Sequence, residues 1–143
     1  MTNWLLLHYK LPSKPSALRV YIWRKLKRLG AILLHDAVWI LPDQLRTAEQ
    51  IQWIAAEIEE MGGNAYYWRA TSLLSAQEEA VTHQFQEQVD AMYSELLKRL
   101  DTSKPDLQEI SGLYQQALSR DFFQSRLGIL VREKLTSKRG EGS

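Results

Sequence analysis

The sequence of 143 residues contains no cysteine, and this absence excludes whole classes of chemistry. Disulfides, thiolate zinc sites, iron–sulfur clusters and thiol-based catalysis all need cysteine, and a chain without it suits a reducing compartment. No apolar run approaches the roughly 20 residues that a membrane-spanning helix needs. The short run WLLLHY is followed directly by Lys10 and Pro12, which is unlike a secretory signal. We therefore expect a soluble cytoplasmic protein.

Patterns typical of catalysis are also scarce. The three histidines, His8, His35 and His83, show no metal-ligand spacing, and no nucleophile elbow, P-loop or dinucleotide fingerprint is present. His35 and Asp36 could form an acid–base pair, but neighbouring residues of a strand point to opposite faces, so a turn explains them better. We predict that the chain is not an enzyme and holds no metal or cofactor.

Acidic residues are missing from the first part of the chain. Residues 1–35 contain seven Lys or Arg and no Asp or Glu, whereas the remainder contains eleven basic and seventeen acidic residues. Charge segregated in this way favours a polyanionic partner for the N-terminal part. A solvated helix face is the alternative, because surface helices are normally charged.

The apolar periodicity predicts an α+β fold, in which a ferredoxin-like βαββαβ unit is followed by an α-helical C-terminal appendage. Gly30 is expected to end the first helix, His35 and Asp36 to separate two strands, and Thr47 with Gln50 to cap the second helix. The expected elements are strands over 4–11, 31–34, 38–41 and 64–69 and helices over 16–29 and 47–61.

The rest of the sequence predicts helices. Ser75 and Glu78 form another capping-box pattern, a long helix follows to about Leu100, and Pro105 suits the first position of the next helix. We divide the chain into a ferredoxin-like domain over 1–72, a helical appendage over 73–137 and a flexible tail over 138–143.

Large apolar side chains lie on both faces of the first and third predicted strands. An uncovered face would expose a larger patch than a soluble monomer usually tolerates, so we expect a homodimer or an appendage folded over the sheet, and prefer the dimer. The five tryptophans are spread over the predicted elements, which is typical of core or interface packing: Trp4, Trp23, Trp39, Trp53 and Trp68.

The first helix carries the candidate nucleic-acid contacts. Arg24 and Arg28 lie one turn apart on one face of this helix, and cations with that spacing can meet successive phosphates. The same groups could hold a small oxyanion through charge-assisted hydrogen bonds. The residues that we assign to nucleic-acid binding are Arg19, Arg24, Lys25, Lys27 and Arg28.

Three segments carry a resemblance to a known family: WLLLHYKLPSKPSALRVYIWRKLKRLGAILLHDAVWILP, QIQWIAAEIEEMGGNAYYWRA and the RDFF of Arg120 to Phe123. The motif RVxxWRKLKRLGA, from Arg19 to Ala31, combines charge, tryptophan and glycine in a specific order. In these segments the chain resembles the N-terminal domain of the chromate-resistance regulator ChrB. The resemblance implies a DNA-binding transcriptional regulator domain of a chromate efflux operon. A protein-interaction or oxyanion-binding module of such a system is the alternative.

The resemblance also bears on partners. The family's second domain has no counterpart in this sequence, so a separate chain that supplies it is one partner to consider, and chromate oxyanion is another. Without cysteine to reduce the metal, we expect no reductase activity and at most weak chromate binding. A more distant similarity is to phenylacetate-catabolism repressors and CRISPR adaptation endoribonuclease-like proteins. The latter place a metal-binding aspartate at the end of the first strand, where this chain has Tyr9 and Lys10, so no metal nuclease is implied.

Overall fold

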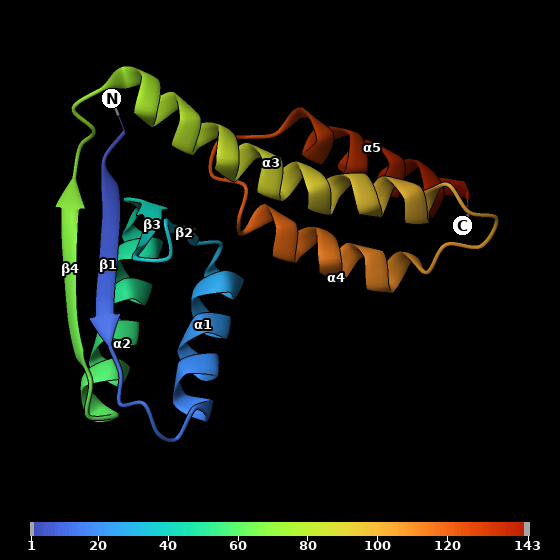
Figure 1. Cartoon of the computed structure of the whole chain (residues 1–143). Helices are drawn as coiled ribbons and strands as arrows, with labels where there is room; N and C mark the ends of the chain where they lie inside the picture. The colour runs from blue at the N-terminus through green and yellow to red at the C-terminus, as the bar shows by residue number, and fades with distance from the viewer. Residues whose placement is uncertain (1, 142–143) are drawn as a thin grey trace. The chain divides into compact units, whose positions relative to one another are not determined.

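The computed structural model describes residues 2–141, which divide into two compact units at Glu78 and Glu79, within helix α3 (Figure 1). The sequence predicts this boundary between residues 72 and 73, six residues earlier. The elements are β1 (Trp4–Lys10), α1 (Ala17–Leu29), β2 (Ile32–Leu34), β3 (Val38–Pro42), α2 (Leu45–Glu60), β4 (Asn64–Ala70), α3 (Ser75–Leu100), α4 (Leu107–Leu118) and α5 (Arg126–Glu141).

The N-terminal unit is built on a four-stranded sheet with the order β2-β3-β1-β4. Neighbouring strands are antiparallel, and β1 lies in the centre, where Leu7 pairs with Trp39 of β3 and Tyr67 of β4. The predicted α+β class, the order β-α-β-β-α-β and the helical C-terminal region are confirmed.

The two faces of this sheet differ in burial. Leu5, Leu7, Trp39 and Leu41 point to one face and are almost completely buried. Helices α1 and α2 lie together on one side of the sheet (Figure 1), and the same burial is seen for their apolar stripes, which include Ile22, Leu26, Ile54 and Ile58. The core of the unit therefore lies between these two helices and the face that carries Leu5 and Leu7.

Left-handed backbone sets the ends of α1 and β2. Gly30 caps α1 with a φ of 94°, and its N–H donates to the carbonyls of Leu26 and Lys27, as a C-terminal glycine does. His35 and Asp36 have φ values of 50° and 58°, the combination of a tight hairpin turn between β2 and β3. The predicted break at His35 and Asp36 is thus a turn.

The predicted N-terminus of α2 is wrong by almost one turn. The helix begins at Leu45, with Gln44 as N-cap and Thr47 at the third helical position. The Thr47 hydroxyl is fully buried, accepts the Gln44 N–H at 2.9 Å and donates to the Pro42 carbonyl at 2.6 Å. Thr47 therefore completes a cap from inside the helix, where a hydroxyl can reach back to the N-cap backbone.

The predicted cap of α3 is also wrong, because Ser75 is already helical. Glu78 turns toward the sheet, and its Oε1 accepts the Thr2 N–H at 2.7 Å and the Trp4 indole N–H at 3.3 Å. The carboxylate thus binds the beginning of β1. Similarly, Pro105 precedes the N-cap of α4, which is Asp106, and the Asp106 carboxylate accepts the Glu109 N–H at 3.1 Å.

The C-terminal unit packs α3, α4 and α5 around one apolar cluster. Tyr93 is completely buried, and its hydroxyl donates to Asp121 Oδ2 at 2.9 Å. Gly128 of α5 packs against this ring so closely that an added Cβ would lie 2.8 Å from Tyr93 Cζ. Helix α5 includes residues 138–141 of the predicted tail, and 142–143 lie outside the described residues. The buried cluster is Val89, Tyr93, Leu96, Leu100, Ile110, Tyr114, Ala117, Val131 and Leu135.

Candidate nucleic-acid and anion interface

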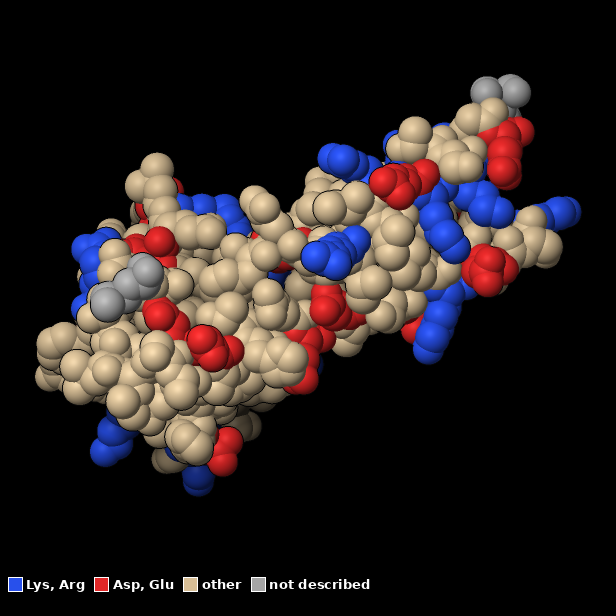
Figure 2. Space-filling model, turned by 90° about the horizontal axis from the view of Figure 1, so that it is seen from above, with Lys and Arg blue, Asp and Glu red and all other residues tan. Residues whose placement is uncertain are grey.

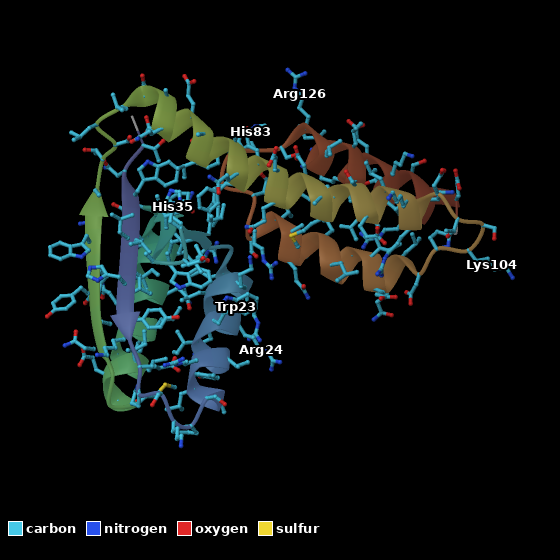
Figure 3. The ribbon with its side chains drawn as sticks, viewed as in Figure 1. Trp23, Arg24, His35, His83, Lys104 and Arg126 are labelled. Atoms are coloured by element: carbon cyan, nitrogen blue, oxygen red, sulfur yellow. The ribbon has the colours of Figure 1, made fainter. Side chains whose placement is uncertain are left out.

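Helix α1 separates its apolar and basic residues. Ile22, Leu26 and Leu29 are buried in the core, whereas the side chains of Arg19, Arg24, Lys27 and Arg28 are exposed. The helix contains no acidic residue, and Figure 3 shows Trp23 and Arg24 projecting from it. By contrast, Lys and Arg are interspersed with Asp and Glu on the face of the molecule in Figure 2. The exposed side of α1 is therefore a surface of one sign.

Lys25, the fifth predicted contact, is engaged within the unit. Its ammonium forms an ion pair with Glu57 of α2, and the Tyr21 hydroxyl donates to the same carboxylate at 2.7 Å. The hydrogen bond with Glu57 raises the pKa of Lys25, and the same bond lowers the pKa of Glu57. Lys25 therefore joins α1 to α2 in the free protein.

Trp23 and Lys27 form a second exposed pair on α1. The Lys27 ammonium lies 5.7 Å from the centre of the Trp23 ring, and 48% of the Trp23 side chain is exposed. An ammonium over an indole face is a cation–π contact, which orders both side chains at the surface. Because Lys27 then keeps a defined position, it can meet a phosphate with less loss of side-chain entropy.

Two hollows adjoin the basic side of α1. One, of about 280 Å³, lies between α1 and α2 and is lined by Lys25, Arg28, Leu29, Arg46, Gln50 and Ile54. The other, of about 440 Å³, follows α1 and is lined by Ala17, Val20, Tyr21, Arg24, Lys25 and Arg28. We call them together the basic cleft. Lys25 and Arg28 line both hollows, and Arg24 and Arg46 add one cation on each side.

The sequence pattern does not single out Arg46 and Gln50. They lie one turn apart near the start of α2, and with Ile54 they form the side of α2 that lines the first hollow. Their i, i+4, i+8 spacing was available in the sequence, but only the packing of α1 against α2 brings Arg46 beside Arg28 and Lys25. The structure thus gathers cations from two helices where the sequence indicated only one.

Neither the histidines nor the tryptophans line the basic cleft. His8 is on β1, His35 in the hairpin turn and His83 on α3, where it contacts Glu87 at 2.8 Å. Within residues 2–141 no three His, Asp or Glu side chains form a metal-binding group, and no helix there is long and apolar enough to cross a bilayer.

The prediction of core packing for the tryptophans is confirmed for only two of them. Trp4 and Trp39 are buried, whereas the exposed fractions of Trp23, Trp53 and Trp68 are 48%, 68% and 54%. For these three the prediction of core packing is wrong. Trp23 and Trp53 lie on the outer sides of their helices, and Trp68 lies on the sheet face away from α1 and α2. An interface role for them stays a prediction.

Comparison with known proteins gives a match over most of the chain. A family model described as "Protein ChrB, N-terminal" matches residues 19–115, which include Arg19, Arg24, Lys25, Lys27, Arg28 and Arg46. "Protein ChrB" of Cupriavidus metallidurans is 27% identical over 108 residues, which is 76% of this chain and 33% of that protein. The chain thus spans about a third of the length of this curated relative.

Proposed function

This chain belongs to the ChrB N-terminal family, and we propose that it serves as a DNA-binding domain of a transcriptional regulator in a chromate-resistance system. The single observation that supports this proposal best is the exposed side of α1, which carries Arg19, Arg24, Lys27 and Arg28 without an acidic residue.

The physics of duplex binding fits such a surface. Cations that neutralise backbone phosphates release condensed counterions, which gives strong, salt-dependent and sequence-independent affinity. Arg24 and Arg28 lie one helical turn apart, and arginine can contact a phosphate with two parallel hydrogen bonds. In the proposed complex the domain is positioned on the DNA backbone by the four exposed cations of α1, which are Arg19, Arg24, Lys27 and Arg28. Arg46 extends the same surface onto α2.

A charge-matched pair of variants tests this function. In the first, Arg24, Lys27 and Arg28 are changed together to glutamine, while Lys25 is retained because it joins α1 to α2. In the control, three exposed cations of α5, Arg126, Arg132 and Lys134, are changed to glutamine. Affinity for the DNA upstream of the protein's own operon is measured by fluorescence anisotropy at several salt concentrations.

We expect the α1 variant to lose most of its affinity and the slope of log K against log salt to fall by about 3, since each phosphate contact contributes roughly 0.9. The α5 control should retain both the affinity and the slope. Equal loss in the two variants would mean that only net charge matters, and unchanged binding by the α1 variant would overturn the proposal.

Binding of a small oxyanion is a second candidate function, and the hollow between α1 and α2 favours it. Lys25, Arg28 and Arg46 line one space of about 280 Å³, and the Gln50 amide adds a neutral donor. A tetrahedral dianion such as chromate needs several charge-assisted donors around one point. Equilibrium dialysis with chromate should show binding that Arg46→Gln weakens and Arg19→Gln leaves unchanged, since Arg19 does not line this hollow. Equal binding by both variants and the unaltered protein would exclude this site.

A further inference from the structure

The sheet face opposite α1 and α2 carries side chains that the basic cleft does not use. The strand register places Leu6 beside Trp68 and His8 beside Tyr66 on this face. Trp4 and Ile40 are buried there, but Tyr66 and Trp68 each remain 54% exposed. Two large aromatic side chains in one exposed group on an edge strand need an explanation, because isolated exposed aromatics are common and clustered ones mark interaction sites.

His8, Tyr66 and Trp68 form one ordered group, which we call the aromatic platform. The Trp68 indole N–H donates to His8 Nε2 at 2.8 Å, and the two ring planes differ by 6° with their centres 6.2 Å apart. Both the indole N–H and the imidazole lone pair lie in the planes of their rings. The two rings therefore lie edge to edge and extend one flat surface, rather than covering each other.

Tyr66 continues this surface. Its ring centre lies 5.5 Å from that of His8 at an interplanar angle of 23°, and 6.4 Å from that of Trp68 at 20°. All three rings are thus near-parallel and adjacent. Because the hydrogen bond fixes Trp68 and His8 before any partner arrives, a ligand that stacks on them loses less side-chain entropy on binding.

The charge next to the platform favours an anionic partner. The strand residues that point to this face include Lys10, which is exposed and follows His8 by two positions. The Glu78 carboxylate reaches this face at Trp4, at the opposite end of β1 from Lys10. None of the strand residues themselves is an Asp or a Glu. The residues are Trp4, Leu6, His8, Lys10, Ile32, Leu34, Val38, Ile40, Pro42, Asn64, Tyr66, Trp68 and Ala70.

We infer that the aromatic platform binds the unpaired bases of a single-stranded nucleic acid. Bases stack on exposed aromatic rings whatever their sequence, and open sheets that display such rings, with a cation nearby for the backbone, bind single strands in this way. The bases of a duplex are stacked on one another and do not expose their faces. The platform therefore binds unpaired bases, which the proposed phosphate contacts of α1 do not recognise. This site is separate from the proposed duplex contact and lies on the other side of the sheet.

The test compares the platform with a tyrosine and a tryptophan on other surfaces of the N-terminal unit. Tyr66→Ala with Trp68→Leu removes the platform, whereas Tyr67→Ala with Trp53→Leu removes the same residue types from other surfaces, where they are 49% and 68% exposed. The probe is a labelled oligothymidylate of about a dozen nucleotides, and the full chain is used. We expect the platform variant to lose at least about tenfold in affinity and the control to change by less than about twofold.

A third variant separates stacking from the hydrogen bond. Trp68→Phe keeps an aromatic face but has no N–H to hold His8, so it should lose less affinity than the platform variant and more than the control.

The dimer expected from the sequence would cover this same face. If light scattering shows that the unaltered protein is a dimer and that the platform variant dissociates without a change in oligothymidylate affinity, a second copy is the occupant and the inference is overturned.

The result is independent of the duplex proposal. The α1 variant with glutamine at positions 24, 27 and 28 should bind the oligothymidylate through an intact platform while it fails on duplex DNA. Loss of duplex binding with single-strand binding retained supports both proposals. If the platform variant and the α1 variant each lose only duplex affinity, the platform inference is wrong and the duplex proposal stands.

Discussion

The two units of this chain differ in where their aromatic and polar side chains lie. In the N-terminal unit, exposed arginines and three exposed tryptophans lie on the surface, around a core that is purely apolar apart from Thr47. In the C-terminal unit, one polar group lies within the helix packing: the buried Tyr93 donates to the half-buried Asp121, and Asp121 accepts the Ser125 N–H at 2.9 Å. We propose that recognition belongs to the N-terminal unit, whereas Tyr93, Asp121 and Ser125 hold the C-terminal helices together.

The largest effect in this comparison is expected at Gly128, within the C-terminal packing. Gly128→Ala forces a methyl group to within 2.8 Å of the buried Tyr93 ring, and overpacking of this kind costs about 1–3 kcal/mol. Chemical denaturation measures the loss. Gly112→Ala on α4 is the matched control, because nothing lies within 4 Å of its Cβ position and the change should stabilise the helix by about 0.5–1 kcal/mol.

Gly128→Ala also tests whether the C-terminal unit takes part in recognition. If Gly128→Ala remains folded at low temperature and yet loses affinity for duplex DNA or for the oligothymidylate, the C-terminal unit takes part in recognition. Retained affinity would support the division of roles described above.

Tyr93→Phe is expected to have an intermediate effect. It removes the hydroxyl that donates to Asp121, while the Ser125 N–H still satisfies that carboxylate, so the cost should be about 0.5–1.5 kcal/mol. Burial raises the pKa of Tyr93 above its usual value of 10.0, and Asp121 raises it further. The folded state therefore holds this proton more tightly than the unfolded state, and stability falls as the pH rises beyond the unfolded pKa. Stability measured above pH 10 should decline more steeply for the unaltered protein than for Tyr93→Phe; parallel curves would contradict the assignment.

The smallest effect on stability is expected for Glu57→Gln, which frees Lys25 in the N-terminal unit. The Lys25–Glu57 pair is partly exposed, so its loss should cost no more than roughly 1 kcal/mol at neutral pH. Since the folded pKa of Glu57 is lowered, the stabilisation is present above the unfolded carboxyl pKa and disappears as the pH falls through the folded value. The two proteins should become equally stable in acid.

Glu57→Gln should also change the affinity for duplex DNA. With its partner neutral, the Lys25 ammonium joins the other cations of α1, so duplex affinity should rise a few-fold at low salt. A fall in affinity would show that the ion pair holds α1 in its binding geometry.

Local patterns predicted the elements of the N-terminal unit well. Gly30 ended α1 because only a left-handed residue suits that position, and the alternation of WLLLHYK identified a central strand. Local patterns failed where several residues could cap one helix: both Gln44 and Thr47 are polar residues near the start of α2, and the burial of the Thr47 side chain decided between them.

The candidate sites depended on contacts that no local pattern contains. Arg19, Arg24, Lys27 and Arg28 could be assigned to an exposed basic helix from their charge alone. That Lys25 is engaged by Glu57, and that Arg46 joins the cleft, follows from how α1 packs on α2. The aromatic platform requires the register of β1 with β4, which pairs His8 with Tyr66 across the sheet.

The position of β1 has a consequence for biosynthesis. This strand leaves the ribosome before the other strands of the sheet. Both of its partners, β3 and β4, are made later, and the hydrogen bond between His8 and Trp68 joins residues 60 positions apart. Until β4 emerges, the apolar side chains of β1 have no sheet to enter, and pairing over such a separation is slow because the intervening chain must first be ordered. The nascent β1 segment therefore exposes apolar side chains until β4 is made, and a pause in translation shortly after β4 would give the sheet time to close.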